Sequence, residues 1–478
     1  MLCGSGSVAL PHTDMFAKNR KKRELSIALL PEALQRLGDC MRGQLVLPHD
    51  PEYCVLRTSW NLDTLACPSA IALVADASDV QMIIRTVSGL DSPKICVSCG
   101  RMGNFCMVQD ALVIDLRRLN QVIVASDLKS VEVEGGVCVG RITEELSKHG
   151  VAFPLGHNPH IGIGGLALTA GVGYLTRMHG FTIDCLLEAQ VVLANGSLVV
   201  ASESENSDLF WALRGGGGNF GIVTRFKFKI FPIPSKIYSG EAIYLPYVQK
   251  PLKSARKVSE YLRQMPQEVS GQMIFVNSGP LVVQFAFIGD PEQGKLAIDQ
   301  AVSSFGWTAL KFFKSCEFHR GLEKLCNGPK GDRQRPGKFY GRILIFRDIS
   351  SEIINLLWEE SHSNACRGVI VVQAIEGKIN RIDPEATAFS SRDARFWVIV
   401  IGEWNKEREK ARVVAWVKRV IDRVSPHAIQ SRIEMAHEDS FTRHQFSASS
   451  WERLRSLKTQ FDPLNLFSLN ENIPPREL

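Results

Sequence analysis

Short apolar runs alternate with polar stretches over the first half of the chain, and their spacing predicts strands and helices in turn. Runs of strand length predict strands over residues 71–74, 95–98, 111–116 and 131–139. Apolar residues at helical spacing predict helices over residues 31–41, 79–88 and 141–149. Asn195-Gly196 lies between the runs 188–193 and 198–201, and this dipeptide is typical of a tight β-hairpin turn.

The pattern changes after Pro232 and Pro234, where longer apolar runs begin. These runs predict strands over residues 272–276, 281–288, 339–346 and 396–404. Between them, helical periodicity predicts helices over residues 293–305, 349–360 and 406–424. We therefore expect an α+β fold whose second domain contains an antiparallel sheet, entered near residue 235 and left near residue 428.

Composition is that of a large globular protein and excludes several other classes. The chain has 478 residues, of which 45% are hydrophobic and 22% are charged. This length suggests two or three folding units of about 150 residues each. This proportion of hydrophobic and charged residues excludes an intrinsically disordered chain, a collagen and a disulfide-rich miniprotein. No apolar run approaches the roughly 18 residues of a membrane helix, so no membrane span is expected.

The distribution of charge and the cysteines indicate which binding partners and which cellular compartment to expect. The net charge of +6 is spread along the chain, so nucleic acid is not an expected partner. The basic cluster 18–23 is interpreted as a solvated face, with a nuclear import signal as the alternative. Residues 1–24 lack the apolar core of a secretory signal, so a cytoplasmic protein with reduced thiols is expected. Cys96 and Cys99 are interpreted as a strand end rather than a redox motif.

Glycine is dense at two places in the first half. One group falls within 25 residues and comprises Gly156, Gly162, Gly164, Gly165, Gly171, Gly173 and Gly180. The other group comprises 215–218 and Gly221. Such stretches let backbone N–H groups approach a ligand closely and can cradle a pyrophosphate. The pattern is not the G-x-G-x-x-G of a compact βαβ unit, and glycines that only make tight turns remain the alternative.

The order of the residues around these glycines is more specific than the glycines themselves. The segment 154–232, which includes DLFWALRGGGGNFG, closely resembles the FAD-binding domain of the berberine bridge enzyme-like family of vanillyl-alcohol-oxidase-type (PCMH-type) oxidases. Further similar blocks at 48–61, 376–404, 451–467 and 473–475 extend the resemblance over roughly residues 45–475. The resemblance implies an α+β fold with a PCMH-type FAD-binding domain of two subdomains. It also implies a substrate domain with a large antiparallel sheet flanked by helices, which holds substrate over the flavin ring.

The resemblance also divides the chain and implies a set of cofactor contacts. The expected segments are an N-terminal tail and helix (1–44), the FAD-binding domain (45–235), the substrate-binding domain (236–428) and a C-terminal return to the FAD-binding domain (429–478). The implied FAD-binding residues are Cys99, Gly100, Arg101, Met102, Gly103, Gly156, Asn158, Ile161, Gly162, Gly164, Gly165, Asp184, Gly221, Ile222, Val223 and Ser450.

The sequence departs from the family where FAD is usually attached. The family's linking histidine aligns with Arg101, and the cysteine of its second link aligns with Asn158. FAD is therefore expected to be bound non-covalently, with Arg101 either pairing with the pyrophosphate or pointing to solvent. The family's Gly-Gly-Gly is here 169–171, and its Tyr-Tyr-Gly-x-Asn is here 446–450, with Ser450 in place of the asparagine. Ile161, at the family's oxygen-gate position, is consistent with a dehydrogenase rather than an oxidase.

Glu376 stands where the family has glycine, on a strand expected to face substrate, and is the candidate general base; a carboxylate at the rim is the alternative. His157 and His160 flank the flavin-facing segment without the partners of a metal site, so no metal is expected. One of them is a candidate proton acceptor, with an exposed or structural histidine as the alternative.

The resulting hypothesis is an FAD-dependent oxidoreductase of secondary metabolism that oxidises a small hydroxylated or amine-bearing molecule by hydride transfer to FAD. The alternatives are a redox-neutral cyclase, pericyclase or isomerase and a non-catalytic member of the fold, with structural or lost FAD. The substrate, the electron acceptor and the oligomeric state are not predicted.

Overall fold

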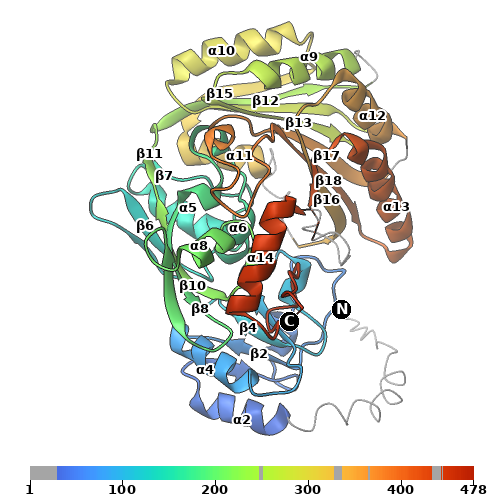
Figure 1. Ribbon diagram of the computed structural model, residues 1–478. Coiled ribbons are helices and arrows are strands. Elements are labelled where there is room, and N and C mark those ends of the chain that lie inside the picture. Colours follow the sequence, from blue (N-terminus) through green and yellow to red (C-terminus); the bar gives the residue numbers. More distant parts are fainter. Residues whose placement is uncertain are drawn as a thin grey trace, which may run out of the picture.

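The computed structural model describes residues 30–246, 251–327, 336–363, 366–432, 443 and 445–477. The basic cluster 18–23 and the segment 1–24 lie outside the described residues. Figure 1 shows a first part, blue to green, below a second part, yellow to orange. The red C-terminal helix α14 (Ala448–Phe461) returns to the first part and packs beside α8 (Ser207–Leu213).

The first part begins with a small mixed sheet in the order β1-β2-β4-β3. Its strands are β1 (Gln44–Val46), β2 (Ala70–Leu73), β3 (Ile95–Ser98) and β4 (Leu112–Asp115), and the last three are parallel to one another. The helices α2 (Leu30–Cys40) and α4 (Ala77–Val87) share an apolar core with this sheet. α4 begins after Asp76, whose carboxylate accepts the N–H groups of Ser78 and Asp79.

A second, antiparallel sheet completes the first part in the order β5-β6-β10-β8-β9. Its strands are β5 (Val122–Val124), β6 (Ser130–Glu134), β8 (Leu186–Val192), β9 (Leu198–Ser202) and β10 (Ile222–Lys229). α5 (Val139–Ser147), α6 (Ile163–Thr169) and α8 contribute to its core. The Asn195-Gly196 hairpin is confirmed, because β8 and β9 pair and Gly196 has a φ of +75°.

One expected strand is shorter than predicted. β6 ends at Glu134 instead of residue 139, because the chain turns at Gly135 and Gly136. A Cβ on Gly136 would lie 1.8 Å from the carbonyl oxygen of Leu116, so this close passage requires glycine.

The second part is built on an eight-stranded antiparallel sheet, counted over the described residues. Its order is β15 (Leu310–Glu317), β12 (Lys236–Tyr244), β14 (Leu281–Phe287), β13 (Val269–Val276), β17 (Arg367–Ala374), β18 (Phe396–Trp404), β16 (Lys338–Phe346) and β19 (Gln430–Arg432). β19 extends this sheet beyond the expected boundary at residue 428. The fold class expected from the sequence, α+β with a large antiparallel sheet flanked by helices, is confirmed.

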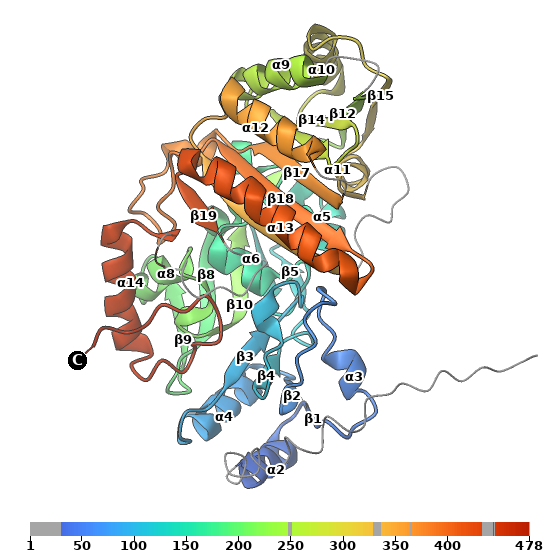
Figure 2. The same cartoon turned by 90° about the vertical axis from the view of Figure 1, so that its right-hand side faces the viewer.

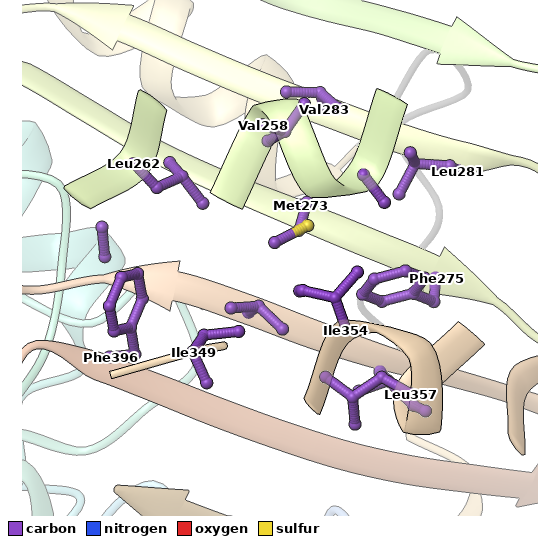
Figure 3. Close-up of a cluster of buried hydrophobic side chains, with 14 of the residues drawn as sticks. Val258, Leu262, Met273, Phe275, Leu281, Val283, Ile349, Ile354, Leu357 and Phe396 are labelled. Carbon is purple, nitrogen blue, oxygen red and sulfur yellow. The ribbon is translucent and has the colours of Figure 1, made fainter. Parts of the chain in front are cut away.

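Helices cover the outer face of this sheet, as Figures 1 and 2 show: α9 (Pro251–Gln264), α10 (Pro291–Ser304), α12 (Ser351–His362) and α13 (Glu407–Val424). Figure 3 shows part of the resulting core, where Val258 and Leu262 of α9 meet strand residues such as Met273 and Val283. The opposite face, which we call the inner face, is turned toward the first part. α11 (Phe318–Asn327) contributes Phe318 and Leu325 to a cluster on that face.

Shorter elements connect these layers. They are α3 (Tyr53–Leu56), α7 (Thr176–His179), the strand pair β7 (Val151–Ala152) and β11 (Phe231–Pro232), and the 3-10 turns Asn104–Cys106, Thr182–Cys185, Gly217–Asn219, Lys378–Arg381 and Ser425–His427. None of the helices in the described part of the chain combines the length and the apolar character that crossing a membrane requires.

Buried polar contacts join the two parts. The Arg177 guanidinium donates to the carbonyl oxygens of Met265, Pro266, Val269 and Glu376, all in the second part. The Arg392 guanidinium forms a two-pronged ion pair with Asp184, at 2.8 and 2.9 Å.

Apolar clusters fill the space around these contacts. One combines Ala170, Phe181 and Ile183 of the first part with sheet residues that include Ile345 and Trp397. The two parts therefore meet through a largely apolar, buried interface that fixes the inner face against the first part.

Candidate functional site

A cavity of about 470 Å³ opens in the first part, where the loop after β3 meets the turn between β6 and α5. Its lining residues are Trp60, Cys99, Gly100, Arg101, Arg117, Asn120, Gly136, Val137, Cys138, Arg141 and His160. This volume lies within the range of about 300–1,000 Å³ that is typical of small-molecule and cofactor sites.

The cavity is lined by three arginines, which make it suitable for an anion. Arg117 is held by Asp115, with Nε 2.8 Å from one carboxylate oxygen. Arg101 instead donates to the Thr58 carbonyl oxygen at 3.0 Å. Burial and the nearby Arg117 charge lower the pKa of Arg101. A guanidinium that is partly buried beside another one favours an anionic partner such as a phosphate group.

The predicted cofactor glycines separate into two groups. Gly100, Gly162 and Gly164 bring two loops together, because a Cβ on Gly100 would lie 2.2 Å from the Gly162 nitrogen, and one on Gly164 would lie 2.5 Å from the Cys99 Sγ. Gly103 and Gly165 have open space where a Cβ would stand. The first group therefore shapes the cavity wall, and the second leaves its backbone accessible.

Arg101 and Asn158, at the two positions of covalent attachment, have defined conformations. Arg101 has a φ of +57°, in the left-handed region, and its carbonyl oxygen accepts the Trp60 N–H at 2.9 Å. Asn158 Oδ1 accepts the His160 N–H at 2.9 Å, which closes a local turn. Beside this turn, a Cβ on Gly156 would meet Ile161 Cδ1 at 2.9 Å, so Gly156 packs against Ile161. Met102 is half-buried next to Arg101.

Several predicted cofactor residues lie elsewhere in the fold. Ile222 and Val223 are buried in two apolar cores. A Cβ on Gly221 would lie 2.5 Å from Val191 Cγ1, so this glycine serves strand packing. Both oxygens of Asp184 are engaged by Arg392. These four residues do not line the cavity described above, and their predicted contact with the cofactor stays a prediction.

The two other departures from the family pattern lie at the interface and in the C-terminal helix. Ala170 belongs to the apolar cluster between the two parts, so its Cβ fills the interface. Ser450 is fully buried on α14, and its Oγ has no hydrogen-bond partner. A buried hydroxyl without a partner is costly, which makes Ser450 a candidate contact for a bound group.

His157 faces the second part. Its Nε2 is 3.4 Å from Nε2 of Gln373 on β17, and its ring packs edge-on against Tyr174 with centroids 4.3 Å apart. Burial lowers the pKa of His157 to about 4. Because the Gln373 amide nitrogen can only donate, His157 Nε2 is an acceptor and the ring is neutral. A neutral imidazole at this position can accept a proton.

Gln373 belongs to a polar row that sequence reasoning missed. Glu241, Gln284, Gln272 and Gln373 are opposite one another on β12, β14, β13 and β17. Gln272 donates to Gln284 at 2.6 Å, and Gln284 donates to Glu241 at 3.0 Å. Gln284 is the one polar residue in the fully buried strand β14, and that irregularity is the signal the sequence carries.

The predicted position of Glu376 is wrong. This residue follows the end of β17 instead of lying on a strand, and its carboxylate pairs with Arg395 at 2.7 Å. The Glu376 N–H and the preceding one both donate to the Arg395 carbonyl oxygen, which turns the chain away from the strand. Its contacts match the rim carboxylate that was the alternative.

The cysteines of the described residues are free thiols, and Cys96 is buried at the end of β3. Burial raises the pKa of the Cys96 and Cys99 thiols, which disfavours the reactive thiolate. Across the segments that the structure covers, no three His, Cys, Asp or Glu side chains gather as a metal site.

Comparisons with known proteins agree with this architecture. A family model described as "FAD binding domain" matches residues 68–202, and one described as "Berberine and berberine like" matches residues 431–474. The uncharacterized FAD-linked oxidoreductase YgaK of Bacillus subtilis (strain 168) is 28% identical over 472 residues, covering 91% of this chain and 97% of the relative.

Two sugar oxidases are also similar. Xylooligosaccharide oxidase of Thermothelomyces thermophilus is 28% identical over 393 residues, covering 77% of this chain and 78% of the relative. The solved structure of a chitooligosaccharide oxidase superimposes with a TM-score of 0.84 at 23% identity, covering 93% of this chain and 100% of that chain. This second likeness shows that the fold is shared.

Proposed function

The chain belongs to the berberine bridge enzyme-like FAD-linked oxidoreductases, and we propose that it oxidises a small hydroxylated or amine-bearing molecule using FAD bound without a covalent link. The observation that carries the proposal is the arginine-lined cavity with Arg101 on its wall. Neither Arg101 nor Asn158 offers the imidazole or thiol of the family's two links.

The residues of the cavity fit FAD. The pyrophosphate is the most anionic portion of FAD, and Arg101 and Arg141 supply positive charge for it, whereas the Arg117 charge is paired with Asp115. Outside the lining of this cavity, the backbone at Gly165 and the unpartnered hydroxyl of Ser450 are further candidates for polar contacts with FAD. When bound, FAD supplies the acceptor for a hydride, that is, for two electrons and one proton.

His157 is the residue we assign to the proton. The substrate loses a hydride from the carbon that bears its hydroxyl or amine, which leaves a carbonyl or imine. The O–H or N–H proton passes to His157 Nε2, where the substrate group replaces the long 3.4 Å contact with the Gln373 amide. The neutral ring and its place between the segment 156–165 and the inner face support this role. Glu376 is not assigned to this step, because Arg395 holds its carboxylate.

Non-covalent binding predicts that the flavin separates from the protein in acid. We expect the purified protein to absorb near 450 nm, and after acid precipitation we expect the yellow colour in the supernatant. Flavin that stays with the protein pellet would contradict non-covalent binding of FAD. No flavin, even after FAD is added, would contradict the proposed oxidoreductase.

Replacing Arg101 with glutamine is expected to raise the dissociation constant for FAD about 10- to 100-fold, since a hydrogen bond to a charged group contributes about 1.5–3 kcal/mol. The measurement is a titration of the apoprotein with FAD. Arg118→Gln is the matched control, because Arg118 is exposed and donates to Gln44. Equal FAD affinity of the Arg101 and Arg118 variants would show that Arg101 points to solvent.

A redox-neutral reaction is the second candidate. It is favoured by the C-terminal segment, where Phe446 stacks on Trp451 and Ser450 replaces the family's asparagine. In that case the flavin would stay oxidised when substrate is added without oxygen, whereas an oxidoreductase would bleach it.

A further inference from the structure

The polarity of the side chains on the inner face of the large sheet changes from one end of the strands to the other. Because side chains alternate between the two faces of a strand, every second residue points toward the FAD-binding domain. At one end, Ile237, Ala286 and Ile288 are buried against that domain. The polar row Glu241–Gln284–Gln272–Gln373 follows one or two steps further, and His157 contacts it at Gln373.

Beyond the polar row, the inner face is aliphatic and only partly covered. We call this surface the aliphatic wall; it consists of Ile243, Ile274, Val276, Val369, Val371, Ile399 and Ile401. Strand pairing places Ile274 opposite Val371 and Val371 opposite Ile399 in one row. Val276, Val369 and Ile401 form the next row.

The burial of these residues is informative. Each is partly exposed, whereas the residues between them on the same strands are buried under the helices of the outer face. Val282, which lies between Ile243 and Ile274 in the sheet, is buried, but the partly exposed aliphatic side chains on either side of it retain apolar surface that a ligand can still cover.

The wall also discriminates between classes of ligand. A hydroxyl group that lies on valine and isoleucine side chains loses its hydrogen bonds to water and gains none, which costs about 1–3 kcal/mol for each group. An oligosaccharide would place several hydroxyl groups there. An aliphatic or aromatic body would lose nothing.

We propose that the substrate has one oxidisable hydroxyl or amine, which lies at His157 beside the polar row, and an extended apolar body, which lies on the aliphatic wall. The proposal rests on the proposed function, since His157 defines the reacting end. The occupant is therefore a small amphipathic molecule and not a sugar chain.

The test is binding of straight-chain primary alcohols from butan-1-ol to octan-1-ol to the full-length protein, measured by calorimetry without turnover. Because burial of a methylene contributes about 0.8 kcal/mol, the dissociation constant should fall about fourfold for each added CH₂. Xylobiose, offered at the same concentrations, should not bind. Equal affinity for butan-1-ol and octan-1-ol, or tighter binding of xylobiose, would overturn the proposal.

A double variant tests whether the alkyl chain lies on the aliphatic wall. Val369→Thr together with Val371→Thr keeps the shape of the side chains and should weaken octan-1-ol binding about tenfold, with little effect on ethanol. The control is Ile123→Thr, at an exposed strand residue of the FAD-binding domain. Unchanged octan-1-ol binding in the double variant would place the alkyl chain elsewhere.

The other possible occupants give different results. If a segment of this chain covered the wall, none of the alcohols would bind, and if a second copy covered it, alcohol affinity would fall as protein concentration rises; either result overturns the proposal. These outcomes are separate from failure of the proposed function. A protein without flavin that still binds octan-1-ol would contradict the oxidoreductase alone, and a flavoprotein that prefers xylobiose would contradict the apolar substrate alone.

Discussion

Replacing His157 with glutamine is expected to lower kcat by about 10²- to 10⁴-fold, which is the usual contribution of a positioned general base. Glutamine retains a hydrogen-bonding side chain next to Gln373 but cannot accept a proton. Flavin content and stability should stay close to those of the parent. The measurement is anaerobic flavin reduction by substrate in single turnover, with flavin content recorded for each variant.

The pH dependence gives this prediction a second readout. Burial lowers the pKa of His157 from 6.5 to about 4, so the neutral ring persists well below neutral pH. In the free enzyme, kcat/KM should therefore decline only as pH falls toward about 4, instead of near 6.5. The residual activity of His157→Gln should lack this decline.

His149→Gln is the control for both readouts, since His149 is exposed in the FAD-binding domain. If the His157→Gln enzyme had the same kcat and the same decline at low pH as the control, His157 would not be the proton acceptor.

Replacing Arg392 with methionine is expected to reduce the free energy of unfolding by about 3–5 kcal/mol, the cost of leaving a buried charge without its partner. The side chains of Arg392 and Asp184 are only 2% and 5% exposed, and Arg392 also donates to Thr387 at 2.6 Å. Urea unfolding followed by fluorescence measures the loss.

Two further variants show whether the ion pair causes this loss. Asp184→Asn combined with Arg392→Met should recover part of the stability, because the stranded carboxylate is removed. Arg395→Met breaks the half-exposed pair with Glu376 and should cost no more than about 1 kcal/mol. If the two arginine variants were equally stable, burial of the Asp184 pair would be irrelevant to the fold.

These variants also decide the role of Asp184, which the family resemblance places at the cofactor. The ion pair predicts that Asp184→Asn lowers stability and leaves the FAD dissociation constant unchanged. A weakened FAD affinity at unchanged stability would restore the cofactor role.

Much of the fold could be predicted from local patterns. β3 and β18 match their expected bounds because each is a compact apolar run with a clear end. β15 was not predicted, since it is an edge strand with little buried surface and therefore little hydrophobic pattern. β12 was not predicted either, because Gly240 and Glu241 interrupt its apolar residues.

The candidate site was less predictable, because it depends on contacts between distant segments. The glycine pattern located the loop around Gly162, the family resemblance located the loop around Gly100, and both loops contribute residues to the cavity wall. The polar row could not be predicted, since it requires the register of four strands. Glu376 was placed wrongly for the same reason, because its Arg395 partner lies on the opposite side of a turn.

The Arg177 contacts between the two parts have a consequence for how molecules move through the enzyme. One guanidinium donates to four carbonyl oxygens of the second part, so separating the two parts would break all four hydrogen bonds to a buried charge. We therefore expect substrate and product to pass without separation of the two parts in each catalytic cycle.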